Sequence, residues 1–107
     1  MFFPVCIDIE NKKCLVIGGG KIAYKKIKTL SRYNSDITVI AEEIKEEKIR
    51  EIGNIDIREK RFSDENLREY MLVVAATDDK ELNEEIAEFC IENNILVNNV
   101  TSKNKMN

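Results

Sequence analysis

Apolar residues in this sequence fall into short runs that charged segments separate. Two runs are apolar throughout their centres, residues 13–18 (KCLVIG) and residues 71–77 (MLVVAAT). Runs of this kind are typical of parallel strands that are covered on both faces. Residues 5–9 (VCIDI) instead alternate apolar and polar side chains, which predicts a half-buried strand. Three further runs also predict strands: 36–41 (DITVIA), 55–59 (IDIRE) and 95–100 (ILVNNV).

The segments between these runs carry helical spacing or helix-end signals. Gly53 is placed to end a helix in the left-handed conformation, and Ser63 is placed to cap the start of one. Asp78 and Glu81 form an Asp-x-x-Glu variant of the capping box. Four helical segments are therefore predicted: 20–32, 42–52, a short turn over 63–70, and the stretch from Asp78 to the ENN at 92–94.

The order of these elements predicts the fold. Strands that alternate with helices imply right-handed crossovers and a parallel sheet with helices on both faces. We expect an α/β, Rossmann-like doubly wound sheet with strand order 3-2-1-4-5, in which residues 13–18 form the first strand. Residues 5–9 are expected to lie as an extra segment near one edge. The 107 residues suit a single domain over 1–107.

Three adjacent glycines follow the first predicted strand. Gly18, Gly20 and Ala23 match the pattern G-x-G-x-x-G/A between a strand and a helix. In this pattern the first glycine allows the tight turn, the second lets a diphosphate approach the backbone, and the small third residue lets the helix pack on the strand. We expect Gly19 to ease a positive φ. The sequence thus favours a dinucleotide site, and the alternative is a glycine-rich turn that binds no ligand.

Acidic residues follow the second predicted strand. Glu42 and Glu43 stand where a dinucleotide-binding domain carries an acid for a ribose hydroxyl, although one or two positions late. Two carboxylates would repel a 2′-phosphate, and no arginine stands beside them to receive one. The pattern therefore favours NAD over NADP. The alternative interpretation is that both glutamates are a solvated first turn of a helix.

Small residues end the second wholly apolar run. Ala75, Ala76 and Thr77 should lie at the carboxyl end of their strand, at the switch point where ligands bind in doubly wound sheets. We expect the Thr77 hydroxyl to bond a ribose or the nicotinamide. Asp78 and Asp79 are expected to cap the next helix.

Composition narrows the classes of function. Hydrophobic residues make up 43% and charged residues 35% of the chain, with a net charge of −3, which is typical of a soluble globular domain. No basic stripe indicates a nucleic-acid partner, and no apolar run or leader-like segment indicates a membrane or a secreted protein. Cys6, Cys14 and Cys90 show no metal-ligand spacing, so we expect no metal site and buried, reduced thiols in a cytoplasmic protein. Histidine is absent, so any proton transfer must use a carboxylate, Lys, Tyr, Cys or water.

Several of these segments together resemble one family. The segments FPVCIDIENKKCLVIGGGKIAYKKIKTL, ITVIAEE, LVVAATDDKELN and NNILVNNV are similar, in this order, to the NAD-binding part of precorrin-2 dehydrogenase and siroheme synthase. The resemblance implies NAD-dependent oxidation of precorrin-2 to sirohydrochlorin, with iron insertion in some members. It also implies a homodimer, with a dimerisation region and a helical domain beyond the part of the family that this chain matches.

The resemblance also implies roles for particular residues. Lys21 and Ile22 match the family's cofactor contacts after the glycines, Glu42 and Glu43 match its adenosine side, and Thr77 lies near the nicotinamide. The family's favoured catalytic aspartate is replaced by Thr101, and a threonine hydroxyl is no base near neutral pH. The catalytic residue therefore stays unknown, with Asp78 as a weak candidate.

Further polar residues are open to two interpretations. Lys21, Lys25 and Lys26 either attract the carboxylates of a tetrapyrrole or face solvent. Asn98 and Asn99, near the end of the last strand, are able to bond cofactor or substrate. Two other functions fit the same sequence: a non-catalytic dinucleotide-binding regulatory or sensor domain, which needs no acid at position 101, and a remnant that binds nothing.

Overall fold

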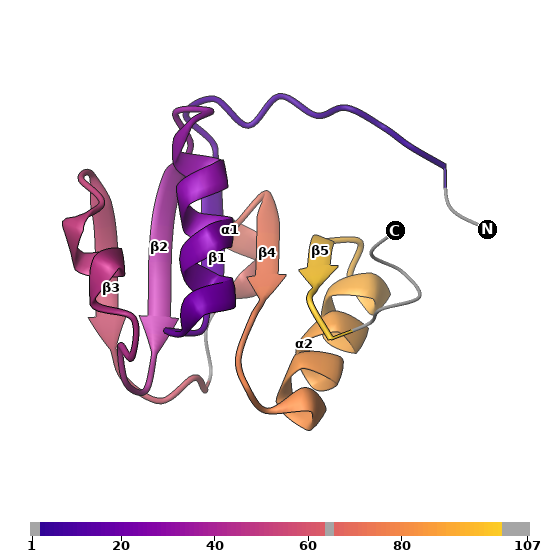
Figure 1. The fold of residues 1–107 in the computed structure, drawn as a ribbon. Coiled ribbons are helices and arrows are strands. Elements are labelled where there is room, and N and C mark those ends of the chain that lie inside the picture. The colour runs from indigo at the N-terminus through magenta and orange to yellow at the C-terminus, as the bar shows by residue number, and fades with distance from the viewer. Residues whose placement is uncertain (1–2, 64–65, 102–107) are drawn as a thin grey trace.

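The sheet has the predicted strand order. The computed structural model describes residues 3–63 and 66–101. In this part of the chain, five parallel strands form one sheet in the order β3-β2-β1-β4-β5 (Figure 1). This order confirms the doubly wound, Rossmann-like fold. The strands are β1 (Lys13–Ile17), β2 (Asp36–Ala41), β3 (Ile55–Glu59), β4 (Leu72–Ala75) and β5 (Leu96–Asn99).

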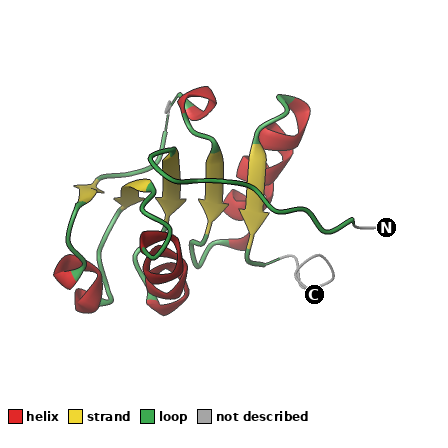
Figure 2. Ribbon diagram, turned by 90° about the horizontal axis from the view of Figure 1, so that it is seen from above, coloured by secondary structure: helices red, strands yellow, loops and turns green. Residues whose placement is uncertain are grey.

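Helices cover both faces of this sheet (Figure 2). The α-helix α1 (Lys21–Ser31) and the 3₁₀ helix η1 (Glu47–Glu51) lie on one face. The α-helix α2 (Lys80–Glu92) and the 3₁₀ helix η2 (Leu67–Glu69) lie on the other. Each face therefore has its own hydrophobic core, as the fold class requires.

The centre of β1 is apolar throughout because helices cover both faces of the sheet. Cys14 and Val16 pack in the core under α1, whereas Leu15 and Ile17 pack in the core under α2. All four side chains are almost fully removed from solvent. A strand with only one covered face would instead alternate apolar and polar residues.

Four asparagines stand just before strands and take the left-handed conformation. Asn11, Asn34, Asn54 and Asn94 have φ between 55° and 61° and precede β1, β2, β3 and β5. Asparagine tolerates this region better than most residues because its short side chain bonds locally. Asn54, rather than Gly53, turns the chain before β3, which corrects the predicted role of Gly53.

The start of α2 differs by one residue from the predicted cap. The Asp79 carboxylate accepts hydrogen bonds from the backbone N–H groups of Glu81 and Leu82, at 3.0 and 3.2 Å. Asp79 is therefore the N-cap, and the expectation that Asp78 forms the capping box is wrong. The Asp78 side chain points to a partner in another loop, described below.

The predicted helix over 42–52 is mostly absent. Residues 42–46 are irregular, and only the five residues of η1 are helical. The backbone N–H groups of Lys45 and Glu46 both donate to the Gly19 carbonyl oxygen, at 2.9 Å each. The Glu46 N–H is therefore bound to the glycine loop and does not bond the Glu42 carbonyl, as it would in a helix that began at residue 42.

The predicted helical turn over 63–70 is shortened to η2. Its cap is Asn66, whose side-chain oxygen accepts from the Arg68 N–H at 3.3 Å, so Ser63 is not the cap. Residues 64 and 65 of the predicted turn lie outside the described residues.

The predicted strand at residues 5–9 is wrong. The chain from residue 3 to residue 9 is extended but pairs with no described strand, and it leads away from the body of the molecule (Figure 1). Ile9 is its only buried residue, whereas Val5 is 70% exposed. Alternation of apolar and polar residues predicts a strand, but a strand also needs a neighbouring edge to pair with, which this segment lacks among the described residues. Cys6 lies in it and is exposed, unlike the buried Cys14 and Cys90.

Among the described residues, no helix is long and apolar enough to cross a bilayer.

Candidate functional site

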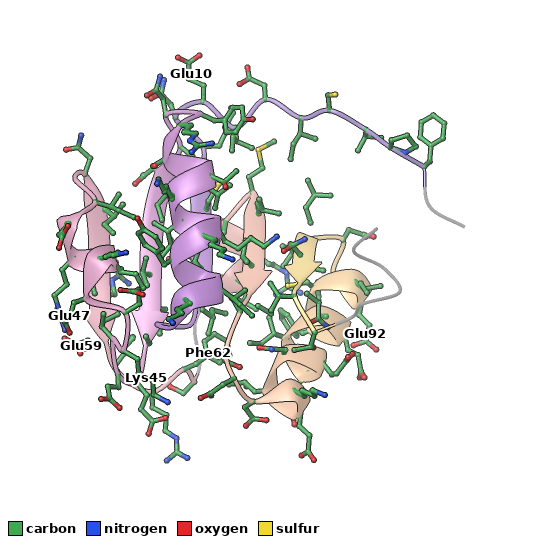
Figure 3. All side chains as sticks on the ribbon, viewed as in Figure 1. Glu10, Lys45, Glu47, Glu59, Phe62 and Glu92 are labelled. Atoms are coloured by element: carbon green, nitrogen blue, oxygen red, sulfur yellow. The ribbon has the colours of Figure 1, made fainter. Side chains whose placement is uncertain are left out.

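A cleft lies at the carboxyl ends of β1, β2 and β4. It encloses about 930 Å³ and is bounded by the loops that follow these strands. Figure 3 shows two of its side chains, Lys45 and Phe62, at the end of the sheet to which the strand arrows point. The predicted cofactor residues line this one cleft: 18–22, Glu42, Glu43, Ala76 and Thr77, together with Asp78.

Gly18 makes the turn between β1 and α1. Its φ is +141°, and a Cβ built on it would lie 2.2 Å from the Ala76 carbonyl oxygen. Its N–H donates to the Ile40 carbonyl at 2.9 Å, which fixes the loop against β2. Both the backbone conformation and the lack of space therefore require glycine here.

The two glycines that follow have different reasons to be glycine. A Cβ on Gly19 would lie 2.4 Å from the Glu43 carbonyl oxygen, so Gly19 serves close packing of two loops. Its φ is not positive, which corrects the predicted role of Gly19. A Cβ on Gly20 would meet no atom within 4 Å. Nothing in the fold itself therefore excludes a side chain at position 20, and the open space beside it belongs to the cleft.

The start of α1 suits a diphosphate. Gly20 is the N-cap and has no side chain to bond the first N–H groups of the helix, and the first turn holds no acidic residue. These N–H groups and the helix dipole point partial positive charge into the cleft beside Gly20. The loop therefore suits the diphosphate of a dinucleotide. The cleft leaves space beside Gly20, and no side chain of the described residues caps the first N–H groups of α1.

The cleft contains charged and aromatic residues that the sequence pattern did not indicate. Lys45 comes from the irregular segment after β2, and Arg61 and Phe62 come from the segment after β3. Phe62 is half-buried and packs against the core under α2. These segments bear no motif, and only the sheet order brings them next to the glycine loop. Sequence reasoning missed all three for this reason.

An ion pair joins the loop after β2 to the loop after β4. Lys45 Nζ lies 3.2 Å from Asp78 Oδ2, and both side chains are largely exposed. The hydrogen bond and charge of Asp78, followed by the charge of Glu43, raise the pKa of Lys45 above its ordinary value. Lys45 therefore stays protonated at any physiological pH.

Asn83 holds the loop that carries Thr77. The Asn83 side chain is fully buried, and its Oδ1 accepts from the Thr77 N–H at 3.1 Å and from the Thr77 hydroxyl at 2.6 Å. Its Nδ2 donates to the Thr77 carbonyl at 3.0 Å. The Thr77 hydroxyl also accepts from the Asp79 N–H at 3.2 Å. The one proton of this hydroxyl is directed at Asn83 Oδ1 or at the Asp79 carbonyl, 3.1 Å away, so a ligand can bond the hydroxyl only through its remaining lone pair.

The residues that follow β4 line the cleft, whereas Thr101, which follows β5, does not. The Thr101 N–H and hydroxyl both donate to Asn99 Oδ1, at 3.1 and 2.8 Å. Asn98 Oδ1 and Asn99 Nδ2 are buried and have no hydrogen-bond partner among the described residues. Lys21 lines the cleft, whereas Lys25 and Lys26 do not.

Within residues 3–63 and 66–101, no group of three or more Cys, Asp or Glu side chains is placed to hold a metal ion.

Fold and cleft together define a dinucleotide-binding domain of the Rossmann class. A family model described as "Putative NAD(P)-binding" matches residues 5–107, and the chain belongs to this family. The siroheme synthase of Ruthia magnifica is 40% identical over 103 residues, covering 94% of this chain and 22% of that protein. The siroheme synthase of Psychromonas ingrahamii is 38% identical over 99 residues, covering 91% of this chain and 21% of that protein.

A solved structure agrees with these relatives. The structure titled SirC, precorrin-2 dehydrogenase, superposes with a TM-score of 0.79 at 30% identity, covering 94% of this chain and 50% of that chain. The chain thus spans about a fifth of the two siroheme synthases and half of the SirC chain. The similarity extends over more than nine-tenths of this chain.

Proposed function

We propose that this chain is the NAD-binding part of a precorrin-2 dehydrogenase. Its substrate is the acidic tetrapyrrole precorrin-2, which it oxidises to sirohydrochlorin with NAD+ as the electron acceptor. The observation that carries the proposal is the coincidence of two findings. The cleft is formed around an open glycine loop, and two siroheme synthases and a precorrin-2 dehydrogenase are each similar to more than nine-tenths of the chain.

NAD is the proposed form of the cofactor. Glu42 and Glu43 are exposed at the cleft after β2, where their carboxylates would accept a hydrogen bond from a ribose hydroxyl. Arg61 is the one arginine among the described residues that line the same cleft, and its guanidinium would favour a 2′-phosphate. Titration with NAD+ and NADP+ decides between the two forms. Tighter binding of NADP+ would assign the adenosine side to Arg61 instead of the two glutamates.

The residues of this chain act mainly by binding and positioning. The glycine loop and the start of α1 hold the diphosphate, and the loop pinned by Asn83 forms the nicotinamide side of the cleft. NAD+ supplies the hydride acceptor when it is bound, so that the two-electron oxidation yields NADH and releases one proton.

That proton needs an acceptor, and Asp78 is the candidate within this chain. Its carboxylate is exposed at the cleft, whereas the Thr101 hydroxyl lies elsewhere and is bonded to Asn99. Asp78 is also on the loop after β4, the side of the cleft that receives the nicotinamide in this fold. Replacement of Asp78 by Asn is expected to lower the rate of oxidation without weakening NAD+ binding.

The experiment is an anaerobic incubation of the protein with precorrin-2 and NAD+. Appearance of NADH absorbance together with sirohydrochlorin supports the dehydrogenase. The same incubation without precorrin-2 is the control for other reductants. Binding of NAD+ with no oxidation of precorrin-2, in a protein that includes the regions its longer relatives have, would contradict the proposal.

A non-catalytic dinucleotide sensor is the second candidate. The observation that favours it is Thr101, whose position and hydrogen bonds to Asn99 give no base at the place where the related enzymes are expected to have one. A sensor would bind NAD+ and NADH with clearly different affinities and would not consume either. Calorimetric titration with both forms, followed by the precorrin-2 assay, separates the two functions.

A further inference from the structure

The cleft carries more negative than positive charge. A dinucleotide brings a diphosphate with its own negative charges into this environment, where carboxylates disfavour it. Each cation near the glycine loop therefore has a large influence on binding. The titratable side chains that line the cleft are four carboxylates (Glu42, Glu43, Asp78 and Asp79) and three cations (Lys21, Lys45 and Arg61).

Lys45 is fixed beside the glycine loop by its backbone. Its N–H donates to the Gly19 carbonyl at 2.9 Å, one residue before the open position at Gly20. The side chain then reaches from the loop after β2 to Asp78 in the loop after β4. The ion pair consequently spans the cleft at the level of the glycine loop, where a diphosphate would have to lie.

The Lys45–Asp78 ion pair is weak enough for Lys45 to exchange Asp78 for another anion. The two side chains are 61% and 85% exposed, and exposed pairs of one ammonium and one carboxylate are weak. A diphosphate offers more charge and more acceptor oxygens than one carboxylate, so it is the better partner for the same ammonium.

We infer that Lys45 is a diphosphate-binding residue that Asp78 occupies in the absence of ligand. When the cofactor enters, the Lys45 ammonium leaves Asp78 for a diphosphate oxygen, and the Asp78 carboxylate becomes free at the mouth of the cleft. This inference rests on the proposed function, because it requires a dinucleotide in the cleft. It couples occupancy of the site to the availability of Asp78, the candidate proton acceptor.

Calorimetric titrations with ADP and with adenosine test the exchange without any turnover. Replacement Lys45→Gln is expected to weaken ADP binding roughly tenfold, which corresponds to about 1.4 kcal/mol, and to leave adenosine binding unchanged. Asp78→Asn is expected to tighten ADP binding, because it removes the competing carboxylate. Lys25→Gln is the matched control, since it removes the same charge from α1 outside the cleft.

The outcomes distinguish this inference from the proposed function. If the wild-type chain binds ADP but Lys45→Gln changes its affinity no more than Lys25→Gln does, the exchange is wrong and the cofactor site stands. An equal loss of adenosine binding in Lys45→Gln would likewise overturn the role on the diphosphate. If the wild type binds neither ADP nor NAD+, both the proposed function and the exchange are overturned. Circular dichroism and thermal melting confirm that each variant is folded.

Discussion

Neighbouring residues in the glycine loop are constrained by different parts of the molecule. Gly18 is required by its positive φ and by the Ala76 carbonyl, and Gly19 by the Glu43 carbonyl. Gly20 is required by neither, because a Cβ at this position would meet no atom within 4 Å beyond its own neighbours along the chain. The loop thus separates residues that make the fold from a residue that leaves room for a ligand.

This separation predicts effects of different size on stability. Gly18→Ala is expected to lower the free energy of unfolding by at least about 2 kcal/mol, because the alanine is strained and collides with backbone. Gly20→Ala is expected to change it by less than about 1 kcal/mol, because its extended backbone accepts any residue. Urea unfolding followed by circular dichroism measures both. Equal losses in the two variants would refute the distinction.

Asn83 is the residue on which the loop after β4 depends. Asn83→Ala leaves the Thr77 N–H and carbonyl without their buried partners and is expected to cost about 2–3 kcal/mol of unfolding free energy. Urea unfolding again gives the value. Glu85→Ala, on the exposed side of the same helix, is the control and is expected to stay within about 0.5 kcal/mol of wild type. A loss in Asn83→Ala no larger than in the control would contradict the role.

At the scale of elements, hydrogen bonds between loops hold residues 42–46 in an irregular conformation where the sequence predicts a helix. The segment from residue 42 to residue 46 packs on the glycine loop, and Glu59 at the end of β3 fixes it from the other side. Glu59 accepts from Arg50 at 2.6 Å and from the Ile44 N–H at 3.3 Å. Local helical spacing cannot reveal such contacts, because Glu59 is distant in sequence.

The Glu59 contacts predict an acid-dependent contribution to stability. The Arg50 hydrogen bond, followed by the Ile44 N–H, lowers the pKa of Glu59 below its ordinary value. Because the folded state holds the ionised form, the contribution is present at neutral pH and is lost as the pH falls below the ordinary carboxyl pKa and through the lowered one. Glu59→Gln should therefore melt at a lower temperature than wild type at pH 7, with a difference that shrinks in acid. A constant difference across this range would contradict the assignment.

At the scale of the whole molecule, the sheet and the main wall of the cleft follow from the sequence. The unbroken apolar centre of β1 and the glycines after it predict a central strand with a ligand loop, and the order β3-β2-β1-β4-β5 confirms the topology. Lys45, Arg61 and Phe62 could not be predicted, since they reach the cleft only through tertiary packing. Residues 5–9 are not a strand, because alternation within a segment gives no information about whether a partner edge is present.

Burial across the molecule predicts different thiol reactivities. Burial raises the pKa of the Cys14 and Cys90 thiols, whereas Cys6 lies on the exposed N-terminal segment. Iodoacetamide at neutral pH should therefore label Cys6 in the folded protein and leave Cys14 and Cys90 unmodified, as peptide mass spectrometry would show. Addition of urea should expose all three. Rapid labelling of Cys14 or Cys90 without urea would mean that the two cores open readily.

The central claim is that the open space beside Gly20 receives the diphosphate of NAD. Calorimetric titration of NAD+ into the wild-type chain and into Gly20→Val measures it most directly. We predict saturable binding to the wild type and at least about a tenfold loss in the variant, with an unchanged circular dichroism spectrum. Equal binding of NAD+ to a folded Gly20→Val variant, or no binding to the wild type, would contradict the claim.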